Sequence, residues 1–506
     1  MLAAVHSASV IGVEAHPVLV EVDVARGLPA WSIVGLASGA VKEARERVCA
    51  ALVNSGFEVP ARRTTVNLSP ADQVKTGTAF DLPIALAVLA ASGQIPAECV
   101  DGLCVAGELG LDGTVRPIRG ALSMARLVQQ RGYRALVLPD ANGGEASLVT
   151  GVPLAGAATL AAVVDQLRNG RLVAPAASTT VAPCGDDDLD LADVAGQGSA
   201  KRALEIAAAG AHNLLLEGPP GAGKTMLARR LPTILPPLTL DEHLEVVAIH
   251  SIGGLLPAGT IPGRVPPFRA PHHTISQAGL IGGGSGPRPG EVSLAHRGVL
   301  FLDELLELPR YVLDAMRQPL EDGRVVIARA AHAVAFPARF MLVAATNPCP
   351  CGRSGTAGAT CTCGVNDIAR YRSRLSGPLA DRLDLRVTVA PVALSAMHTG
   401  GESSADVRQR VVAARERQRT RYARSPGVHA NAQAPVRILR GTDGPTADAH
   451  SWLITAADRL HLSARGYARV LRVARTIADL DGADVIERDI LAEALQFRGE
   501  REAVRH

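Results

Sequence analysis

The segment at residues 218–225 constrains this chain more than any other. It follows the pattern glycine, four residues, then Gly-Lys-Thr, between an apolar stretch at 212–217 and a helix-forming stretch at 226–231. A strand, a glycine-rich turn and a helix in this order direct backbone N–H groups and a helix N-terminus at a phosphate. Lys224 would reach the β- and γ-phosphates, and the Thr225 hydroxyl would bind Mg²⁺. The candidate nucleotide-binding residues are Gly218, Pro219, Pro220, Gly221, Ala222, Gly223, Lys224 and Thr225.

Length and composition indicate a globular protein of several domains. The chain has 506 residues, of which 47% are hydrophobic and 20% charged. Its net charge of +3 neither predicts nor opposes nucleic-acid binding. The longest apolar run, residues 82–91, is about half the ~20 residues that a membrane-spanning helix needs. The N-terminal residues also lack the basic start of a signal peptide, so we expect a cytoplasmic protein without a membrane partner.

Three regions of an α/β chain differ in their patterns. Residues 1–170 combine β-branched strands with Ala-rich helices, which predicts an α+β domain. The stretch 171–190, with its Pro, Ser, Thr and Asp residues, predicts a linker. Residues 191–395 alternate strand and helix, a pattern typical of a parallel sheet with helices on both faces. The remainder, 396–506, is helical in pattern and predicts an all-α C-terminal domain.

An acid pair extends the predicted phosphate site. The apolar stretch 299–302 ends in Asp303 and Glu304, about 80 residues after the glycine-rich loop. A buried parallel strand would deliver both carboxylates beside that loop. Asp303 would complete the Mg²⁺ site, and Glu304 would polarise the attacking water. Two surface acids at a strand end are the alternative.

Two later residues fit the same site. Asn347 follows the apolar stretch 340–346, so it would contact the γ-phosphate or the water; a turn-starting Asn before Pro348 is the alternative. Arg382 offers a guanidinium of the kind that one subunit delivers to the γ-phosphate of its neighbour. Pairing between Arg382 and Asp384 is the alternative.

This ordered set of residues, followed by a helical tail, resembles an AAA+ ATPase of the magnesium-chelatase-like clade. Three further segments resemble its ComM (YifB) subfamily: 267–276, 287–296 and 473–480. The resemblance covers essentially the whole chain. It implies a ring, expected to be a hexamer, that moves branched DNA and binds ATP and Mg²⁺ at the seam between subunits.

The resemblance also assigns roles to residues that spacing alone does not identify. It implies that Arg382 is the arginine finger and that Arg465 is the lid arginine that senses nucleotide, with Arg469 and Arg472 close by in the sequence. It further places the His272–His273 pair in a loop that faces the ring pore. A metal site at these two histidines is the less favoured alternative, because adjacent histidines seldom share one ion.

The N-terminal region resembles the Lon protease domain, which has the ribosomal S5 domain 2-like fold, over two segments: 75–83 and 104–120. Lon-type peptidases need a serine activated by a lysine. Here the serine position falls on Ala79 and the lysine position on Leu122, and neither side chain can do this chemistry. Ser123 and Lys75 are the nearby substitutes that a shifted alignment would offer. We expect a domain without peptidase activity that serves protein docking or assembly.

Four of the eight cysteines gather in one short segment: Cys349, Cys351, Cys361 and Cys363. Four thiolates suit a tetrahedral, structural Zn²⁺ site that would brace the loop between Asn347 and Arg382. The usual spacing in such sites is Cys-x₂-Cys, whereas this chain has two Cys-x-Cys pairs. Four reduced thiols without a metal are the alternative.

One predicted helix, 405–423, and the residue after it carry seven arginines: Arg408, Arg410, Arg415, Arg417, Arg419, Arg421 and Arg424. Acidic residues dilute this charge, so a solvated helix face is the alternative to a phosphate-binding one. A ring that tracks a DNA backbone needs only phosphate contacts, and the chain has no motif that reads base sequence. The expected partner, branched or single-stranded DNA, therefore rests on the resemblance.

The expected function is a branch-migration ATPase of recombination or natural transformation. A chelatase-type motor that remodels a protein partner or a metal-insertion enzyme is the alternative; tetrapyrrole insertion would require a partner with an integrin-like metal-binding domain. A third alternative, an ATP-dependent peptidase, is opposed by Ala79 and Leu122.

Overall fold

The computed structural model describes residues 1–72, 74–176, 189–284, 287–328, 333–355, 360–375, 377–392 and 400–498. It divides into two compact units that do not follow sequence order. Unit 1 contains Met1–Cys184, Leu240–Gly263 and Ala328–Phe336, and unit 2 contains Gly185–Thr239, Arg264–Ile327 and Pro337–His506. Residues 177–188, most of the predicted linker, lie outside the described residues.

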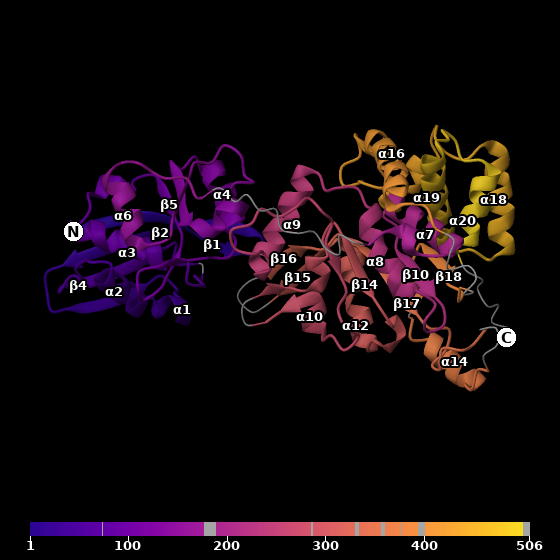
Figure 1. Cartoon of the computed structure of the whole chain (residues 1–506), viewed down its shortest axis with the longest axis horizontal. Helices are drawn as coiled ribbons and strands as arrows, with labels where there is room; N and C mark the ends of the chain where they lie inside the picture. Colours follow the sequence, from indigo (N-terminus) through magenta and orange to yellow (C-terminus); the bar gives the residue numbers. More distant parts are fainter. Residues whose placement is uncertain are drawn as a thin grey trace. The chain divides into compact units, whose positions relative to one another are not determined.

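Unit 1 is built on a seven-stranded sheet in the order β3-β4-β2-β1-β5-β8-β9. Strands β1, β2, β4 and β5 of this sheet are labelled in Figure 1. Its strands are β1 (Leu2–Ile11), β2 (Glu14–Ala25), β3 (Ala30–Val34), β4 (Arg63–Ser69), β5 (Leu103–Val105), β8 (Ala135–Pro139) and β9 (Leu154–Ala157). β1 and β2 pair antiparallel along their length, whereas β5, β8 and β9 run parallel. Helices α2 (Ala44–Asn54) and α6 (Leu160–Arg168) also belong to this unit.

The apolar run 82–91 forms the central helix of unit 1. Helix α3 (Asp81–Ala91) is buried at every position and packs on β1 and β2. Such burial on all sides fits its composition, because the helix is apolar around its whole circumference. Its one acid, Asp81, accepts a 2.7 Å hydrogen bond from Arg47 Nε.

A helix from the middle of the sequence completes unit 1. Helix α9 (Leu240–Gly253) packs against α4 (Ala121–Arg131). Val247 and Ala248 of α9 belong to the same buried cluster as Leu122 of α4. The Gly120 N–H, at the start of α4, donates a 2.7 Å hydrogen bond to Ser251 Oγ.

Unit 2 contains the predicted parallel sheet. Its five strands lie in the order β11-β14-β17-β10-β18, and each adjacent pair is parallel. The strands are β11 (Phe268–Arg269), β14 (Val299–Leu302), β17 (Met341–Thr346), β10 (Leu214–Glu217) and β18 (Leu385–Thr388). Helices α7 (Gly198–Gly210) and α8 (Lys224–Ile234) pack against each other beside this sheet.

The C-terminal region of unit 2 is helical, as predicted (Figure 1). Its main helices are α16 (Ser404–Tyr422), α18 (Ala447–Arg459), α19 (Ala464–Asp481) and α20 (Arg488–Gln496). α19 packs on α16 and α20, and α16 also contacts α7 and α8. A parallel-sheet domain with a helical C-terminal region confirms the predicted fold class. Within the described ranges, no helix is both long enough and apolar enough to span a membrane.

Candidate active site

The glycine-rich loop joins the end of β10 to the start of α8. Gly221 and Gly223 have φ angles of 78° and 91°, which favour residues without a Cβ. Gly218 lies so close to the residue that follows β18 that a Cβ there would stand 2.3 Å from the Val389 carbonyl oxygen. The glycines of the motif therefore meet two different needs, a left-handed turn and a close backbone approach.

Lys224 is held inside this loop. Its Nζ donates to the carbonyl oxygens of Gly218 at 2.6 Å and Pro219 at 2.9 Å, and to Asn347 Oδ1 at 3.1 Å. Burial lowers the pKa of Lys224, while the negative charges of Asp303 and Glu304 act in the opposite direction. The residues predicted to surround the phosphates thus lie together.

The predicted Mg²⁺ ligands are hydrogen-bonded neighbours. Thr225 Oγ1 donates to Asp303 Oδ2 at 2.7 Å. Asp303 follows β14, and its other carboxylate oxygen accepts the Glu304 N–H at 2.9 Å. A hydroxyl and a carboxylate are hard oxygen ligands, so this pair fits Mg²⁺.

A cavity of about 400 Å³ unites these groups. It is lined by Pro220, Gly221, Ala222, Gly223, Lys224, Thr225, Met226, Asp303, Glu304, Thr346 and Asn347. The lining comes from the carboxyl ends of three parallel strands: the loop after β10 with the first turn of α8, the two residues after β14, and the end of β17. Backbone amides, one ammonium group and two carboxylates converge there, a set suited to a nucleotide phosphate with its metal ion.

His273 joins the site, although the motifs do not identify it. Its Nδ1 lies 3.2 Å from Glu304 Oε2, and both side chains are partly exposed. The adjacent His272 instead contacts Thr274 Oγ1 through Nδ1 at 2.9 Å. The two histidines therefore have different partners. His273 follows β11, and β11 lies beside β14 in the sheet. The pairing of these two strands is the feature from which the proximity of His273 to Glu304 could have been predicted.

Arg382 and Arg465 do not line the cavity of their own chain. Arg382 forms an ion pair with Glu321, and its carbonyl accepts a hydrogen bond from Asn213. The alternative pairing of Arg382 with Asp384 is wrong, because Asp384 accepts the Asn213 N–H at 3.1 Å instead. Burial lowers the pKa of Arg382, and the positive charge of the nearby Arg465 lowers it further.

Arg469 and Arg472, close to Arg465 in the sequence, are tied to the fold. Arg469 donates to Asp381 Oδ1 at 3.1 Å and to the Leu383 carbonyl at 3.2 Å. Arg472 donates to the Ala434 carbonyl at 2.9 Å. Since Asp381 and Leu383 lie beside Arg382 in the sequence, the contacts of Arg469 link α19 to the segment that carries Arg382.

The four clustered cysteines come together after β17. Their sulfur atoms all lie within 4.8 Å of one another. Cys349 Sγ is 3.4 Å from Cys351 Sγ and 3.7 Å from Cys361 Sγ, and the latter two are 3.6 Å apart. Hydrogen bonds from the backbone of Thr362 and Arg353 lower the pKa of Cys351 to about 5. This is a preformed four-thiol site able to hold one metal ion.

The protease-like residues of unit 1 do not form a serine–lysine pair. Leu122 is fully buried in the core. Ser123 Oγ donates to the Val13 carbonyl at 2.8 Å, whereas Lys75 Nζ donates to the Pro70 carbonyl. The two substitute residues are thus occupied by separate backbone groups.

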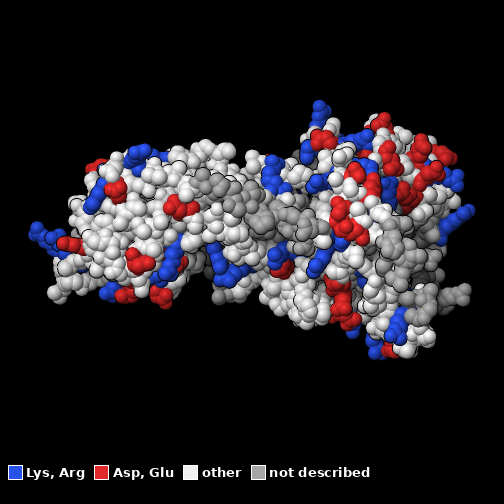
Figure 2. Space-filling model, in the orientation of Figure 1, with Lys and Arg blue, Asp and Glu red and all other residues white. Residues whose placement is uncertain are grey.

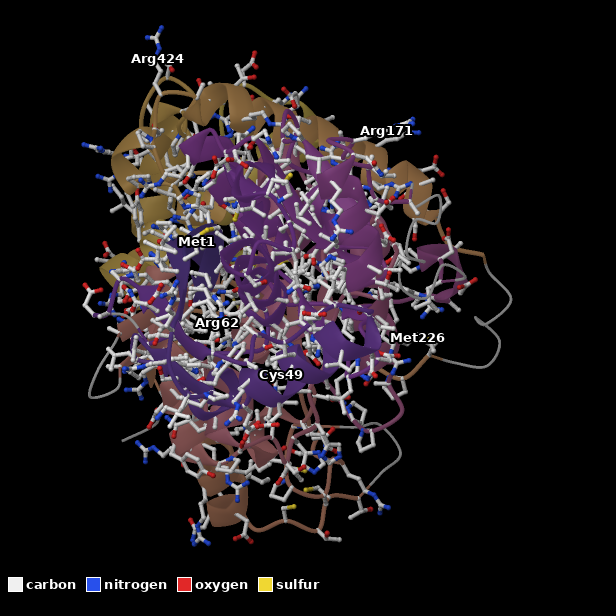
Figure 3. The ribbon with its side chains drawn as sticks, turned by 90° about the vertical axis from the view of Figure 1, so that its left-hand side faces the viewer. Met1, Cys49, Arg62, Arg171, Met226 and Arg424 are labelled. Carbon is white, nitrogen blue, oxygen red and sulfur yellow. The ribbon has the colours of Figure 1, made fainter. Side chains whose placement is uncertain are left out.

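Most of the arginines on α16 make contacts within the chain. Arg410 pairs with Glu205 and Glu402, and Arg421 pairs with Asp443 and Asp479. The contacts of the others are Arg415 with the Ala208 carbonyl, Arg417 with the Asp479 carbonyl and Arg419 with Glu416. Figure 2 shows acidic and basic side chains interspersed over this helical region on the face in view. Arg424, just beyond the helix, extends away from the ribbon (Figure 3).

Comparisons with known proteins identify the family. Residues 190–397 match the family model "Magnesium chelatase, subunit ChlI", residues 20–142 match "Subunit ChlI of Mg-chelatase", and residues 401–498 match "Magnesium chelatase, subunit ChlI C-terminal". An uncharacterized protein of Mycobacterium tuberculosis is 46% identical over 494 residues, which are 97% of each chain.

Two further relatives match over nearly their full length. The uncharacterized protein YifB of Escherichia coli is 45% identical over 502 residues, 98% of this chain and 97% of its own. The competence protein ComM of Haemophilus influenzae is 46% identical over 507 residues, with the same coverage. The chain therefore belongs to the ComM and YifB branch of the magnesium-chelatase-like AAA+ ATPases, as the motifs predicted.

Proposed function

We propose that this chain is a Mg²⁺-dependent ATPase that assembles into a ring, expected to be a hexamer, and uses hydrolysis to move branched DNA. One observation carries the ATPase part: Lys224, Thr225, Asp303, Glu304 and Asn347, far apart in the sequence, line one cavity. Their geometry supports phosphoryl transfer to water by positioning and charge stabilisation. The ring and the DNA substrate rest on the family and on a relative named as a competence protein.

In this proposal each residue has a separate task. The loop amides and Lys224 hold the phosphates, and Thr225 and Asp303 hold Mg²⁺, which supplies charge neutralisation when bound. Glu304 aligns and polarises the attacking water, and Asn347 orients the γ-phosphate or that water. In this proposal, one chain supplies all of these groups.

Arg382 acts on the nucleotide of the neighbouring subunit. It is absent from the lining of its own cavity, and Arg465 contributes positive charge beside it. A pair of arginines from the next subunit would complete the site electrostatically, with Arg382 on the γ-phosphate and Arg465 as the nucleotide sensor. Head-to-tail interfaces of this kind generate closed rings.

Single substitutions test the assigned tasks. Lys224→Ala should lose ATP binding. Glu304→Gln should still bind ATP but should hydrolyse it at least about 100-fold more slowly, because it loses the general base. Fluorescent-nucleotide titration and phosphate release separate the two effects. A Glu304→Gln enzyme that hydrolyses ATP at the wild-type rate would show that another group aligns the water.

A mixing experiment tests whether Arg382 acts between subunits. Lys224→Ala and Arg382→Ala chains should each be inactive alone. In an equimolar mixed ring, about a quarter of the interfaces would combine an intact loop with an intact Arg382 from its neighbour. ATPase activity should therefore reappear on mixing, and its absence in verified mixed rings would place the role of Arg382 elsewhere.

The DNA part is tested by measuring ATP hydrolysis with a four-way junction, single-stranded DNA, casein or no addition, together with junction migration. Stimulation by branched DNA with migration supports the proposal. Stimulation by a protein partner alone supports the alternative, a chelatase-type motor, which the family models favour by name. Peptide cleavage is not expected, because Ala79 and Leu122 occupy the protease-like positions.

The remaining proposals concern location and auxiliary sites. We place the protein in the cytoplasm. We assign the Lon-protease-like residues 1–170 to docking of protein partners or to assembly. We also assign a structural zinc ion to the four clustered cysteines. Reduced thiols 3.4–3.7 Å apart fit a reducing compartment.

A further inference from the structure

We propose that a zinc ion bound by Cys349, Cys351, Cys361 and Cys363 fixes the position of the phosphate-binding loop, so that ATP affinity depends on zinc. The zinc loop is here the described residues 349–355 and 360–363. The inference rests on the proposed ATP site and adds to it a structural metal with control over nucleotide binding.

The distances between the sulfur atoms fit a tetrahedral zinc ion. Zn–S bonds of ~2.3 Å in a tetrahedron place neighbouring sulfur atoms ~3.8 Å apart. Three of the sulfur–sulfur distances are 3.4, 3.6 and 3.7 Å, and all four atoms lie within 4.8 Å of one another. The Ser354 N–H donates to Cys349 Sγ at 3.3 Å, the kind of backbone hydrogen bond that stabilises a metal-bound thiolate.

The zinc loop has little else to hold its shape. The described residues 349–355 and 360–363 include no Leu, Ile, Val, Met or aromatic residue, so this part of the chain offers no large apolar side chain for a core of its own. Cys349 is the buried member of the four cysteines. A metal that ties four points of a core-less segment supplies the ordering that side-chain packing supplies elsewhere.

This loop touches the phosphate-binding loop at one defined point. Gly352 is buried, with a φ angle of 76°, and lies against the ring of Pro220. A Cβ at Gly352 would stand 2.5 Å from Pro220 Cδ and 2.8 Å from its Cγ. Pro220 lines the nucleotide cavity, so the backbone of the zinc loop at Gly352 supports a residue of the phosphate-binding loop from outside the cavity.

A second connection runs through the chain itself. Asn347 accepts a hydrogen bond from Lys224 and stands two residues before Cys349, the buried ligand. The zinc ion would thus fix both the partner of Lys224 and the backbone that supports Pro220. Release of the zinc ion removes both supports at once.

The first experiment measures zinc and nucleotide binding independently. Purified full-length protein should contain one zinc ion per chain by elemental analysis, and the Cys361→Ser/Cys363→Ser variant should contain none. The variant should bind a fluorescent ATP analogue at least about tenfold more weakly, a loss typical of disturbed metal-site support. Cys99→Ser, a cysteine of unit 1, is the control and should retain wild-type affinity.

A chelator tests the same point without a mutation. An aromatic nitrogen chelator, which prefers zinc to the hard Mg²⁺ ion, should lower ATP affinity in step with zinc release, and added zinc should restore it. Thermal melting of the treated protein shows whether unit 2 stays folded. This arm keeps the proposal testable even if the cysteine variant fails to fold.

Two glycine substitutions test the contact itself. Gly352→Ala should retain zinc and yet lose ATP affinity, because its methyl group displaces Pro220. Gly355→Ala is the matched control, since Gly355 has a similar φ of 72° but open space around a Cβ, so it should lose neither.

The outcomes separate the inference from the proposed function. Wild-type protein without zinc, or zinc-free protein with unchanged ATP affinity, would overturn the inference. Equal ATP affinity of the Gly352→Ala and Gly355→Ala proteins would overturn the contact through Pro220. A zinc-loaded wild-type protein that binds no ATP would instead contradict the proposed ATPase.

Discussion

At the scale of single residues, the environment of Glu304 decides how well it can align water. Its carboxylate lies 3.2 Å from His273 Nδ1, and its backbone adopts a left-handed φ of 50°. A non-glycine residue in that conformation is held there by its surroundings, here by the N–H that Glu304 donates to Asp303. We therefore predict that His273 positions the carboxylate of the proposed base.

We expect His273→Ala to lower kcat while KM for ATP stays unchanged, because the histidine contacts Glu304 and not the phosphate loop. The effect should be about two- to tenfold, since the two side chains are 38% and 46% exposed and such pairs are weak. Steady-state ATPase kinetics measure it. His272→Ala is the matched control with unchanged kcat; an equal fall in both variants, or a raised KM, would contradict this role.

The same residues show what a sequence reveals about a site. Asp303, Asn347 and the glycine-rich loop were predictable, because adjacent parallel strands bring their carboxyl ends together, as β14, β17 and β10 do. The partner of Arg382 was not predictable. Its sequence neighbour Asp384 was the natural candidate, yet the chain folds so that Glu321, remote in sequence, reaches the guanidinium.

At the scale of elements, α16 illustrates how a charged helix is used. Sequence alone left open whether its arginines face solvent or phosphate. The structure gives several of them a third role, because they attach the helix to its neighbours. Arg421 donates to both carboxylate oxygens of Asp479, at 2.7 and 2.9 Å, and Asp479 is fully buried on α19. Burial lowers the pKa of Arg421, but hydrogen bonding to Asp479 outweighs it and raises the pKa.

We predict that Asp479→Asn destabilises unit 2 by about 3–5 kcal/mol, because it leaves Arg421 and Arg475 buried without their common counter-ion. Arg419→Ala on the same helix, which removes an exposed pair with Glu416, should cost less than about 1 kcal/mol. Urea denaturation followed by circular dichroism compares the two. Similar losses for both variants would mean that the α16–α19 contact does not depend on this ion pair.

At the scale of the whole molecule, the units are interleaved along the chain. The sequence pattern predicted domains in succession, because periodicity reports local structure and not which elements share a core. Helix α9 follows α8 directly in sequence, yet its Val247 and Ala248 are buried in the core of unit 1. The chain leaves unit 2 before Leu240 and returns to it after Gly263 at neighbouring points, since the Leu238 N–H donates to the Arg264 carbonyl at 3.0 Å.

This arrangement predicts the behaviour of truncated chains. Removal of residues 1–184 alone should give an aggregating protein, because α9 loses the core that buries its apolar face. Removal of the same residues together with 240–263, replaced by a short Gly-Ser linker between Thr239 and Arg264, should improve solubility and preserve ATP binding, since the residues that line the nucleotide cavity belong to unit 2. Size-exclusion chromatography and nucleotide titration compare the two chains. If the simple truncation is monodisperse and the second deletion brings no gain, α9 does not depend on unit 1 for burial.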